Sequence, residues 1–234
     1  MECADYSLLL QFRSRIDAIE ALTVKLAETL RAAVAANGFA SLVVSGGSSP
    51  RGLFHLLRGI ELPWSHVTII PSDERWVPLD DEASNEGMIR RELLQGPVAA
   101  ARLVSLYRSG KTAADAVADV DSRISAIARP FDFVVLGMGT DGHTASLFPT
   151  SPNIEGALQS DRQVIVQDVP RLRQSRVSLT TRALLDAGEI GLLIFGEAKL
   201  ATLKRASRAG PVSEYPVRAV LHQPGVVVTT YWAP

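Results

Sequence analysis

Short apolar segments alternate with helical patterns along most of this chain, and this alternation restricts the fold more than any other feature. Seven segments have the length and apolar content of strands: "SLVVSGG", "HVTIIPSDE", "ARLVSLY", "FDFVVLGMG", "RQVIVQDV", "GEIGLLIFG" and "GVVVTTYW". Helical patterns separate most of them. Such an order of elements predicts an α/β fold of three layers, in which a mostly parallel sheet has helices on both faces.

Helices are predicted from apolar spacing and from stop signals. Apolar residues recur at helical spacing from Ile16 to Val34, and Asn37 with Gly38 supplies the stop. Further helices are expected from Pro50 onward, after Ser84 as N-cap, from Thr112 to Ala128, and in "TTRALLDAG" and "EAKLATLKRASRA". We find no internal repeat and no linker long enough to divide the chain, so residues 1–234 are expected to form a single domain.

Composition excludes several classes of function. The formal net charge of -1 gives no overall attraction to nucleic acid or to an anionic membrane, so any bound anion must be held locally. Cys3 is the single cysteine, which excludes a disulfide framework and a thiolate metal cluster and indicates a reducing compartment. No secretory leader and no apolar run of the ~20 residues that a membrane span needs is found. We therefore expect a cytoplasmic protein.

Polar turns follow four of the predicted strands: "SGGSSPRG", "PSDERWVP", "GMGTDGHTASLFP" and "FGEAKLATL". In an open parallel sheet, ligands bind beyond the carboxyl ends of the strands. These four turns are therefore expected to meet at one site.

The third of these turns contains Gly137, Gly139 and Gly142, which satisfy the dinucleotide-binding pattern G-x-G-x-x-G. That kind of site needs a long helix after the third glycine, but Pro149 and Pro152 interrupt the segment that follows. Asp141 would also place a carboxylate where the pyrophosphate should lie. The pattern is therefore not interpreted as a nicotinamide or flavin site.

The same turn carries Asp141 and His143, two residues apart. A histidine titrates near neutral pH, and a nearby carboxylate can fix its tautomer, so the pair is suited to acid/base catalysis. Alternatively, Asp141 caps a short helix and His143 lies unused in its first turn. The triplet alone leaves both interpretations open.

The other turns favour a site for a phosphorylated small molecule. The turn "SGGSSP" offers backbone N–H groups and the hydroxyls of Ser48 and Ser49 as a cradle for an anion. Arg75 and Lys199 could add positive charge, and Asp73 precedes Arg75 in the same turn. Each feature also has an ordinary structural explanation. The "SGGSSP" segment could be a flexible turn, Asp73 and Arg75 could form a surface ion pair, and Lys199 could merely cover a helix face. Their common place after strands predicts one phosphate-binding site.

Six segments of the chain resemble the motifs of a known family. The segments "SGGSSPRGLF", "SDERWVPLDDEASNEGMIRREL", "LGMGTDGHTASLFP", "RVSLTTRALLDAG", "FGEAKLATL" and "YPVRAVL", in this order, are similar to those of the 6-phosphogluconolactonases of the oxidative pentose phosphate pathway. The resemblance runs from about Ile16 to the C-terminus. Glucosamine-6-phosphate deaminases share the G-x-D-G-H core, but they follow it with a stretch resembling "IAFNEP". This chain has "TASLFP" there and no glutamate until Glu155.

The resemblance implies a Rossmann-like parallel sheet, no metal and no redox cofactor. It implies that His143 is the general base and that Asp141 is its partner or orients the substrate. Asp73 would bind substrate hydroxyls or hold Arg75 in place. It also implies that Arg75 and Lys199 contact the phosphate and that Arg176 contacts the substrate. The phosphate loop would consist of Gly46, Gly47, Ser48 and Ser49. The stretch "VPRLRQSR" before Arg176 departs from the family's commoner proline-and-histidine pattern.

The reaction that the resemblance implies is hydrolysis of 6-phospho-D-glucono-1,5-lactone to 6-phospho-D-gluconate. The partner is then a phosphorylated sugar lactone, with no nucleic acid and no membrane, and the oligomeric state is not predicted. Backbone N–H groups near Gly139 or Gly142 are candidates for stabilising the oxyanion. Two alternatives are a glucosamine-6-phosphate deaminase or related isomerase, and a sugar-phosphate sensor that binds without turnover.

Overall fold

The computed structural model describes residues 7–170 and 172–234, so Cys3 and Arg171 lie outside the described residues. The strands are β1 (Ser7–Gln11), β2 (Ala40–Val44), β3 (Val67–Pro71), β4 (Asp73–Arg75), β5 (Arg102–Leu103), β6 (Phe133–Leu136), β7 (Val164–Gln167), β8 (Arg176–Leu179), β9 (Glu189–Phe195) and β10 (Val227–Ala233). The helices are α1 (Arg15–Asn37), α2 (Arg51–Leu57), α3 (Asn85–Glu92), α4 (Ala113–Ser125), α5 (Ile154–Leu158), α6 (Thr181–Leu185), α7 (Glu197–Ala206) and α8 (Arg218–Leu221). Short 3-10 turns lie at Trp64–His66 and Gly96–Ala100.

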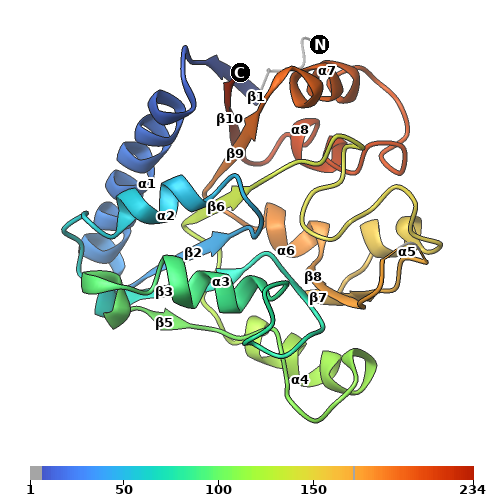
Figure 1. Cartoon of the computed structure of the whole chain (residues 1–234), viewed down its shortest axis with the longest axis horizontal. Coiled ribbons are helices and arrows are strands. Elements are labelled where there is room, and N and C mark those ends of the chain that lie inside the picture. Colours follow the sequence, from blue (N-terminus) through green and yellow to red (C-terminus); the bar gives the residue numbers. More distant parts are fainter. Residues whose placement is uncertain (1–6, 171) are drawn as a thin grey trace.

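The main sheet has seven strands in the order β1-β10-β9-β6-β2-β3-β5 (Figure 1). All of its paired strands are parallel, which confirms the predicted sheet. Its edges differ from the prediction. The edge strand β1 was not predicted from the sequence, and β5 has only two residues where "ARLVSLY" predicts a longer strand. The chain leaves β5 because the hydroxyl of Ser105 bonds to the backbone of Tyr107 and closes a turn.

Helices cover both faces of this sheet, as predicted (Figure 1). Leu42 and Val44 of β2 pack into the cluster that contains the apolar faces of α1, α2 and α3. Val43, which points to the other face, packs into the cluster that contains residues of α4, α6, α7 and α8. Successive strand residues point to opposite faces, so a fully buried strand must be apolar throughout.

A second sheet of three antiparallel strands, β4-β8-β7, lies beside the first. The prediction of "RQVIVQDV" as a strand is confirmed as β7. The sequence did not predict the antiparallel partner β8, and its interpretation of "SDER" as a turn was wrong, because these residues include strand β4. Only residues 168–175 connect β7 to β8, and a parallel crossover needs a dozen residues or more, so the two strands can pair only as an antiparallel hairpin.

Local capping chemistry sets the helix boundaries. Ser14 and Asp17 form a capping box at the start of α1, and Gly38 ends it with a φ of 80°, in the left-handed region that glycine tolerates. The hydroxyl of Ser84 accepts from the backbone N–H of Gly87, as its prediction as N-cap requires. Within residues 7–170 and 172–234, no helix has the length and the apolar character needed to cross a membrane.

Candidate active site

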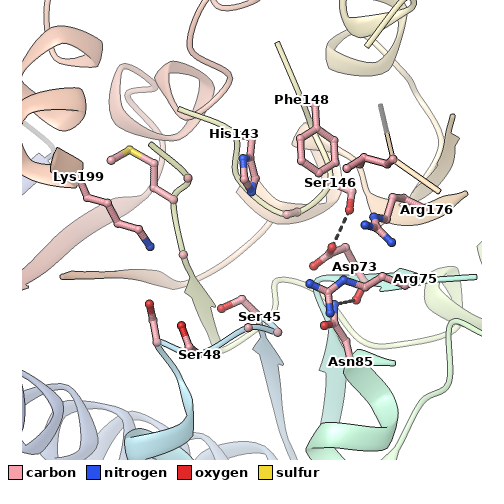
Figure 2. Close-up of a pocket in the computed structure, with 18 residues that line it drawn as sticks. Ser45, Ser48, Asp73, Arg75, Asn85, His143, Ser146, Phe148, Arg176 and Lys199 are labelled. Atoms are coloured by element: carbon pink, nitrogen blue, oxygen red, sulfur yellow. Dashed lines mark hydrogen bonds between the residues drawn. The ribbon is translucent and has the colours of Figure 1, made fainter. Parts of the chain in front are cut away.

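A cavity of about 330 Å³ lies where β2, β4, β6 and β9 end, and the predicted turns meet there (Figure 2). Nine of the ten predicted site residues line it: Gly46, Gly47, Ser48, Ser49, Asp73, Arg75, His143, Arg176 and Lys199. Asp141, the tenth, contacts His143 instead. The lining also includes Asn85, Ser146, Phe148 and Leu172, which were not predicted.

His143 projects into this cavity from a tight turn rather than from a helix. The backbone N–H of Gly139 donates to the carbonyl of His143 over 2.9 Å, and that of Gly142 donates to the carbonyl of Gly139 over 3.0 Å. The next helix, α5, begins only at Ile154, so the interpretation of Asp141 as a helix cap was wrong. Among the oxyanion donors that the sequence suggested near Gly139 or Gly142, the N–H groups of these two glycines themselves are occupied within the turn.

Asp141 orients the imidazole of His143. Its Oδ1 lies 2.6 Å from Nδ1 of His143 and also accepts the backbone N–H of His143. Burial raises the pKa of Asp141, but the hydrogen bonds and charge of His143 outweigh burial and hold the pKa below its ordinary value. Because an ionised carboxylate can only accept, Nδ1 is the donor and Nε2 of the neutral ring is left free to accept a proton.

Close packing holds the ring of His143 on both sides. The Phe148 ring lies 4.5 Å from it, centroid to centroid. On the other side, a Cβ at Gly139 would overlap Nδ1 of His143 and the carboxylate of Asp141. Glycine at this position therefore makes room for the histidine and does not make a dinucleotide turn.

The loop Gly46–Ser49 forms one end of the cavity. Gly47 has a φ of 90°, which favours glycine, and a Cβ at Gly46 would overlap the side chain of Asn85. Lys199, in the first turns of α7, reaches the same end, as Figure 2 shows. Burial lowers the pKa of Lys199, and the charge of Arg15 lowers it further.

The opposite end of the cavity in Figure 2 holds Arg75, Arg176 and Asp73, with His143 and Ser45 between the two ends. The Asp73 carboxylate accepts the hydroxyls of Ser72 over 2.9 Å and of Ser146 over 2.6 Å. Nη1 of Arg75 donates to the carbonyl of Ala83 over 2.8 Å. Asp73 makes no ion pair with Arg75 within the described residues, so it does not hold Arg75 in the way that the sequence left open.

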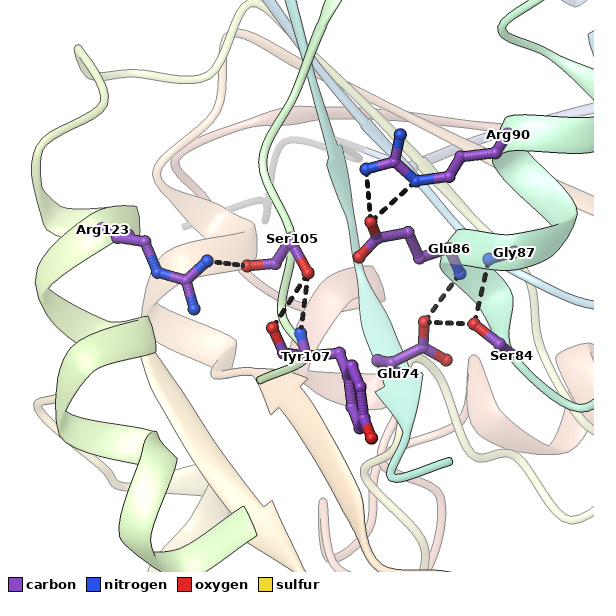
Figure 3. Close-up of polar contacts among 8 residues, drawn as sticks. All are labelled: Glu74, Ser84, Glu86, Gly87, Arg90, Ser105, Tyr107 and Arg123. Carbon is purple, nitrogen blue, oxygen red and sulfur yellow. Dashed lines mark hydrogen bonds and ion pairs between the residues drawn. The ribbon is translucent and has the colours of Figure 1, made fainter. Parts of the chain in front are cut away.

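Glu74 supports the end of the cavity that holds Arg75 and Arg176, here called the arginine end, and Figure 3 shows its contacts with the start of α3. Its side chain is fully buried, and its carboxylate accepts the backbone N–H groups of Arg75, Asn85 and Glu86, each over 2.7 Å. The hydroxyl of Ser84 donates to it over 3.0 Å. Burial raises the pKa of Glu74, and these hydrogen bonds oppose the rise. The carboxylate thus joins β4 to the start of α3 and sets where Arg75 and Asn85 enter the cavity.

Asn85 connects the two ends. Its Nδ2 donates to the backbone carbonyl of Asp73 over 2.8 Å, and its amide packs against Gly46. The position after an N-cap serine carries no signal in the sequence that would have predicted this contact. For metal binding, no cluster of three or more His, Cys, Asp or Glu side chains is suitably placed in the described parts of the chain.

Comparisons with known proteins agree on one family. The model of the glucosamine-6-phosphate isomerases/6-phosphogluconolactonase family matches residues 13–232. The chain is 43% identical to a 6-phosphogluconolactonase of Pseudomonas putida, over 89% of this chain and 85% of the relative. It is 42% identical to that of Rhizobium meliloti strain 1021, over 92% and 94%. The crystal structure of a 6-phosphogluconolactonase from Shewanella baltica OS155 superposes with a TM-score of 0.95 at 38% identity, covering 97% of this chain and 98% of the other.

Proposed function

Because the chain is an enzyme of the glucosamine-6-phosphate isomerase/6-phosphogluconolactonase family, we propose that it hydrolyses 6-phospho-D-glucono-1,5-lactone to 6-phospho-D-gluconate in the cytoplasm. This is the second step of the oxidative pentose phosphate pathway. The observation that carries the proposal is the His143–Asp141 pair in one cavity with a glycine and serine loop and a lysine. Such a cavity supports chemistry on a small molecule that carries a phosphate.

The proposed reaction uses His143 twice. Nε2 of the neutral ring takes a proton from water as the water oxygen attacks C1 of the lactone. The resulting tetrahedral oxyanion collapses, the bond from C1 to the ring oxygen breaks, and the imidazolium gives its proton to that oxygen. The new carboxylic acid then loses its proton to solvent. Asp141 keeps Nδ1 as the donor and stabilises the imidazolium between the two proton transfers.

The loop Gly46–Ser49 and Lys199 are proposed to hold the phosphate. Within the described part of the chain, the backbone N–H groups of this loop donate to no other residue, and the side chain of Lys199 makes no ion pair. These groups can therefore donate to phosphate oxygens without breaking a contact. Holding the substrate at C6 leaves C1 free to meet His143, so positioning adds to the acid/base contribution.

The first test is the rate of lactone hydrolysis by purified protein, above the spontaneous background. We expect fast turnover of the phosphorylated lactone and slow turnover of glucono-1,5-lactone, which lacks the phosphate. The same protein should release no ammonia from glucosamine 6-phosphate. Ammonia release would support the deaminase instead, and binding of the lactone without acceleration would support a sensor.

Lys199 also makes phosphate binding depend on pH. Its lowered pKa means that the ammonium loses its proton below the ordinary value of 10.5, whereas the arginines stay charged. The dissociation constant for 6-phosphogluconate is therefore expected to rise as the pH is raised through that lowered pKa. Calorimetric titrations between pH 7 and 10.5 measure it. In Lys199→Met the dissociation constant should be higher than in the wild-type protein at pH 7 and should not change with pH over the same range. If it rose with pH as much as in the wild-type protein, the assignment of Lys199 as the titrating phosphate ligand would be wrong.

A further inference from the structure

Arg176 is a buried cation that makes no ion pair with any of the described residues. Its side chain enters the cavity from β8 and the residue is only 8% exposed. Within the described residues, Nη1 has no hydrogen-bond partner and no carboxylate makes an ion pair with the guanidinium. Burial lowers the pKa of Arg176 and the charge of Arg75 lowers it further, while the charges of Asp73 and Glu74 oppose this effect. A buried guanidinium without a direct partner is unfavourable, so this arginine is arranged to bind an anion in the cavity that it lines.

The cavity has two separate cationic ends, whereas the proposed substrate has one phosphate. Lys199 and Ser48 lie at one end in Figure 2, and Arg75 and Arg176 lie at the other, beyond His143. The loop end has backbone N–H groups and hydroxyls and suits a phosphate. The arginine end contains the carboxylate of Asp73, which would repel a dianion more strongly than it repels a group with a single negative charge.

We propose that Arg176, with Arg75 beside it, binds the oxygens on C1 of the ligand. It would contact the lactone carbonyl, stabilise the oxyanion that forms when water attacks, and hold the carboxylate of the product. This inference rests on the proposed function. The planar guanidinium fork matches the two oxygens of a carboxylate, and donors aimed at a developing oxyanion lower the barrier. With the N–H groups of Gly139 and Gly142 occupied in their turn, the arginines take the role of oxyanion donors.

Two ligands that differ only at C1 test the proposal by binding alone. 6-Phosphogluconate has a carboxylate there, and sorbitol 6-phosphate has a hydroxymethyl group. We expect the wild-type protein to prefer the carboxylate in calorimetric titrations. In Arg176→Met the ratio of the dissociation constant for sorbitol 6-phosphate to that for 6-phosphogluconate should fall by roughly 10- to 100-fold. This is the usual effect of losing hydrogen bonds to a charged group. In Lys199→Met both ligands should weaken by the same factor, so the preference should remain.

Kinetics provide a second, independent readout. Arg176→Met should lower kcat/KM by a similar factor for the phosphorylated lactone and for glucono-1,5-lactone, because C1 is the same in both. Lys199→Met should affect the phosphorylated lactone alone. Arg182→Met is the matched control, since it removes one arginine whose side chain is 59% exposed and pairs with Asp161 away from the cavity. It should change neither the preference nor the rates.

Stability separates a role in ligand binding from a purely structural one. The guanidinium of Arg176 has no partner among the described residues, so Arg176→Met should keep or raise the Tm. If Arg176→Met fails to fold, Arg176→Lys takes its place, because lysine retains the charge without the planar fork. This variant should retain part of the preference for 6-phosphogluconate over sorbitol 6-phosphate. The proposal would be overturned if Arg176→Met weakened the binding of both ligands equally, or lowered kcat/KM for the phosphorylated lactone alone. Either result would make Arg176 a phosphate ligand. If the wild-type protein hydrolyses neither lactone, the proposed function fails, while the ligand preference still decides the role of Arg176.

Discussion

Replacement of His143 by alanine is expected to lower kcat for the phosphorylated lactone by about 10² to 10⁴-fold, the usual contribution of a positioned general acid and base. The dissociation constant for 6-phosphogluconate should stay within a few-fold of the wild-type value, because His143 lies between the two ends that are proposed to hold the ligand. Steady-state kinetics with saturating substrate and calorimetric titration of 6-phosphogluconate measure the two quantities separately.

The control for this variant is His55→Ala. The side chain of His55 is 58% exposed, and it lies 3.9 Å from Glu92, outside the cavity. Its loss should leave kcat unchanged. Full turnover by His143→Ala with excess substrate would mean that another group activates the water, and the assignment of the base would be wrong.

The second large effect concerns stability. Glu74→Ala leaves two buried backbone N–H groups, one partly buried N–H group and the hydroxyl of Ser84 without their acceptor, and each buried donor without a partner is unfavourable. We expect the free energy of unfolding to fall by roughly 3 kcal/mol, since water entering the new space can satisfy some of these donors. Arg75 and Asn85 should also lose their fixed positions, which raises KM. Urea denaturation and steady-state kinetics test these two results.

Glu82→Ala is the matched control, because Glu82 is an exposed glutamate in the segment that Glu74 holds. It should change the free energy of unfolding by no more than about 0.5 kcal/mol, as surface substitutions usually do. If Glu74→Ala were as stable as this control, the donors around Glu74 would have found other partners, and its proposed role in shaping the arginine end would fail.

The central strands of the main sheet, most of the helices and the close pairing on the turn after β6 could be predicted from the sequence. The C-terminal end of α1 was predictable because Asn37 and Gly38 act on backbone groups within a few residues. The pairing of Asp141 with His143 was predictable for the same reason, since two residues on one tight turn must be neighbours. The glycine and serine loop was identified because its composition and its place after a strand are both local properties.

The division of the cavity into two ends, and the contacts that support them, could not be predicted from the sequence. Ser146 reaches Asp73 from a distant part of the chain, and Asn85 packs against Gly46 from the start of another helix. No periodicity reports such contacts, because they depend on how separate elements pack. The chain shows two arginines and one lysine in separate motifs, and the fold sets Lys199 beside the loop and Arg176 beyond His143. Local sequence specifies which groups are present, whereas the distances between groups on different strands are set by sheet order and packing.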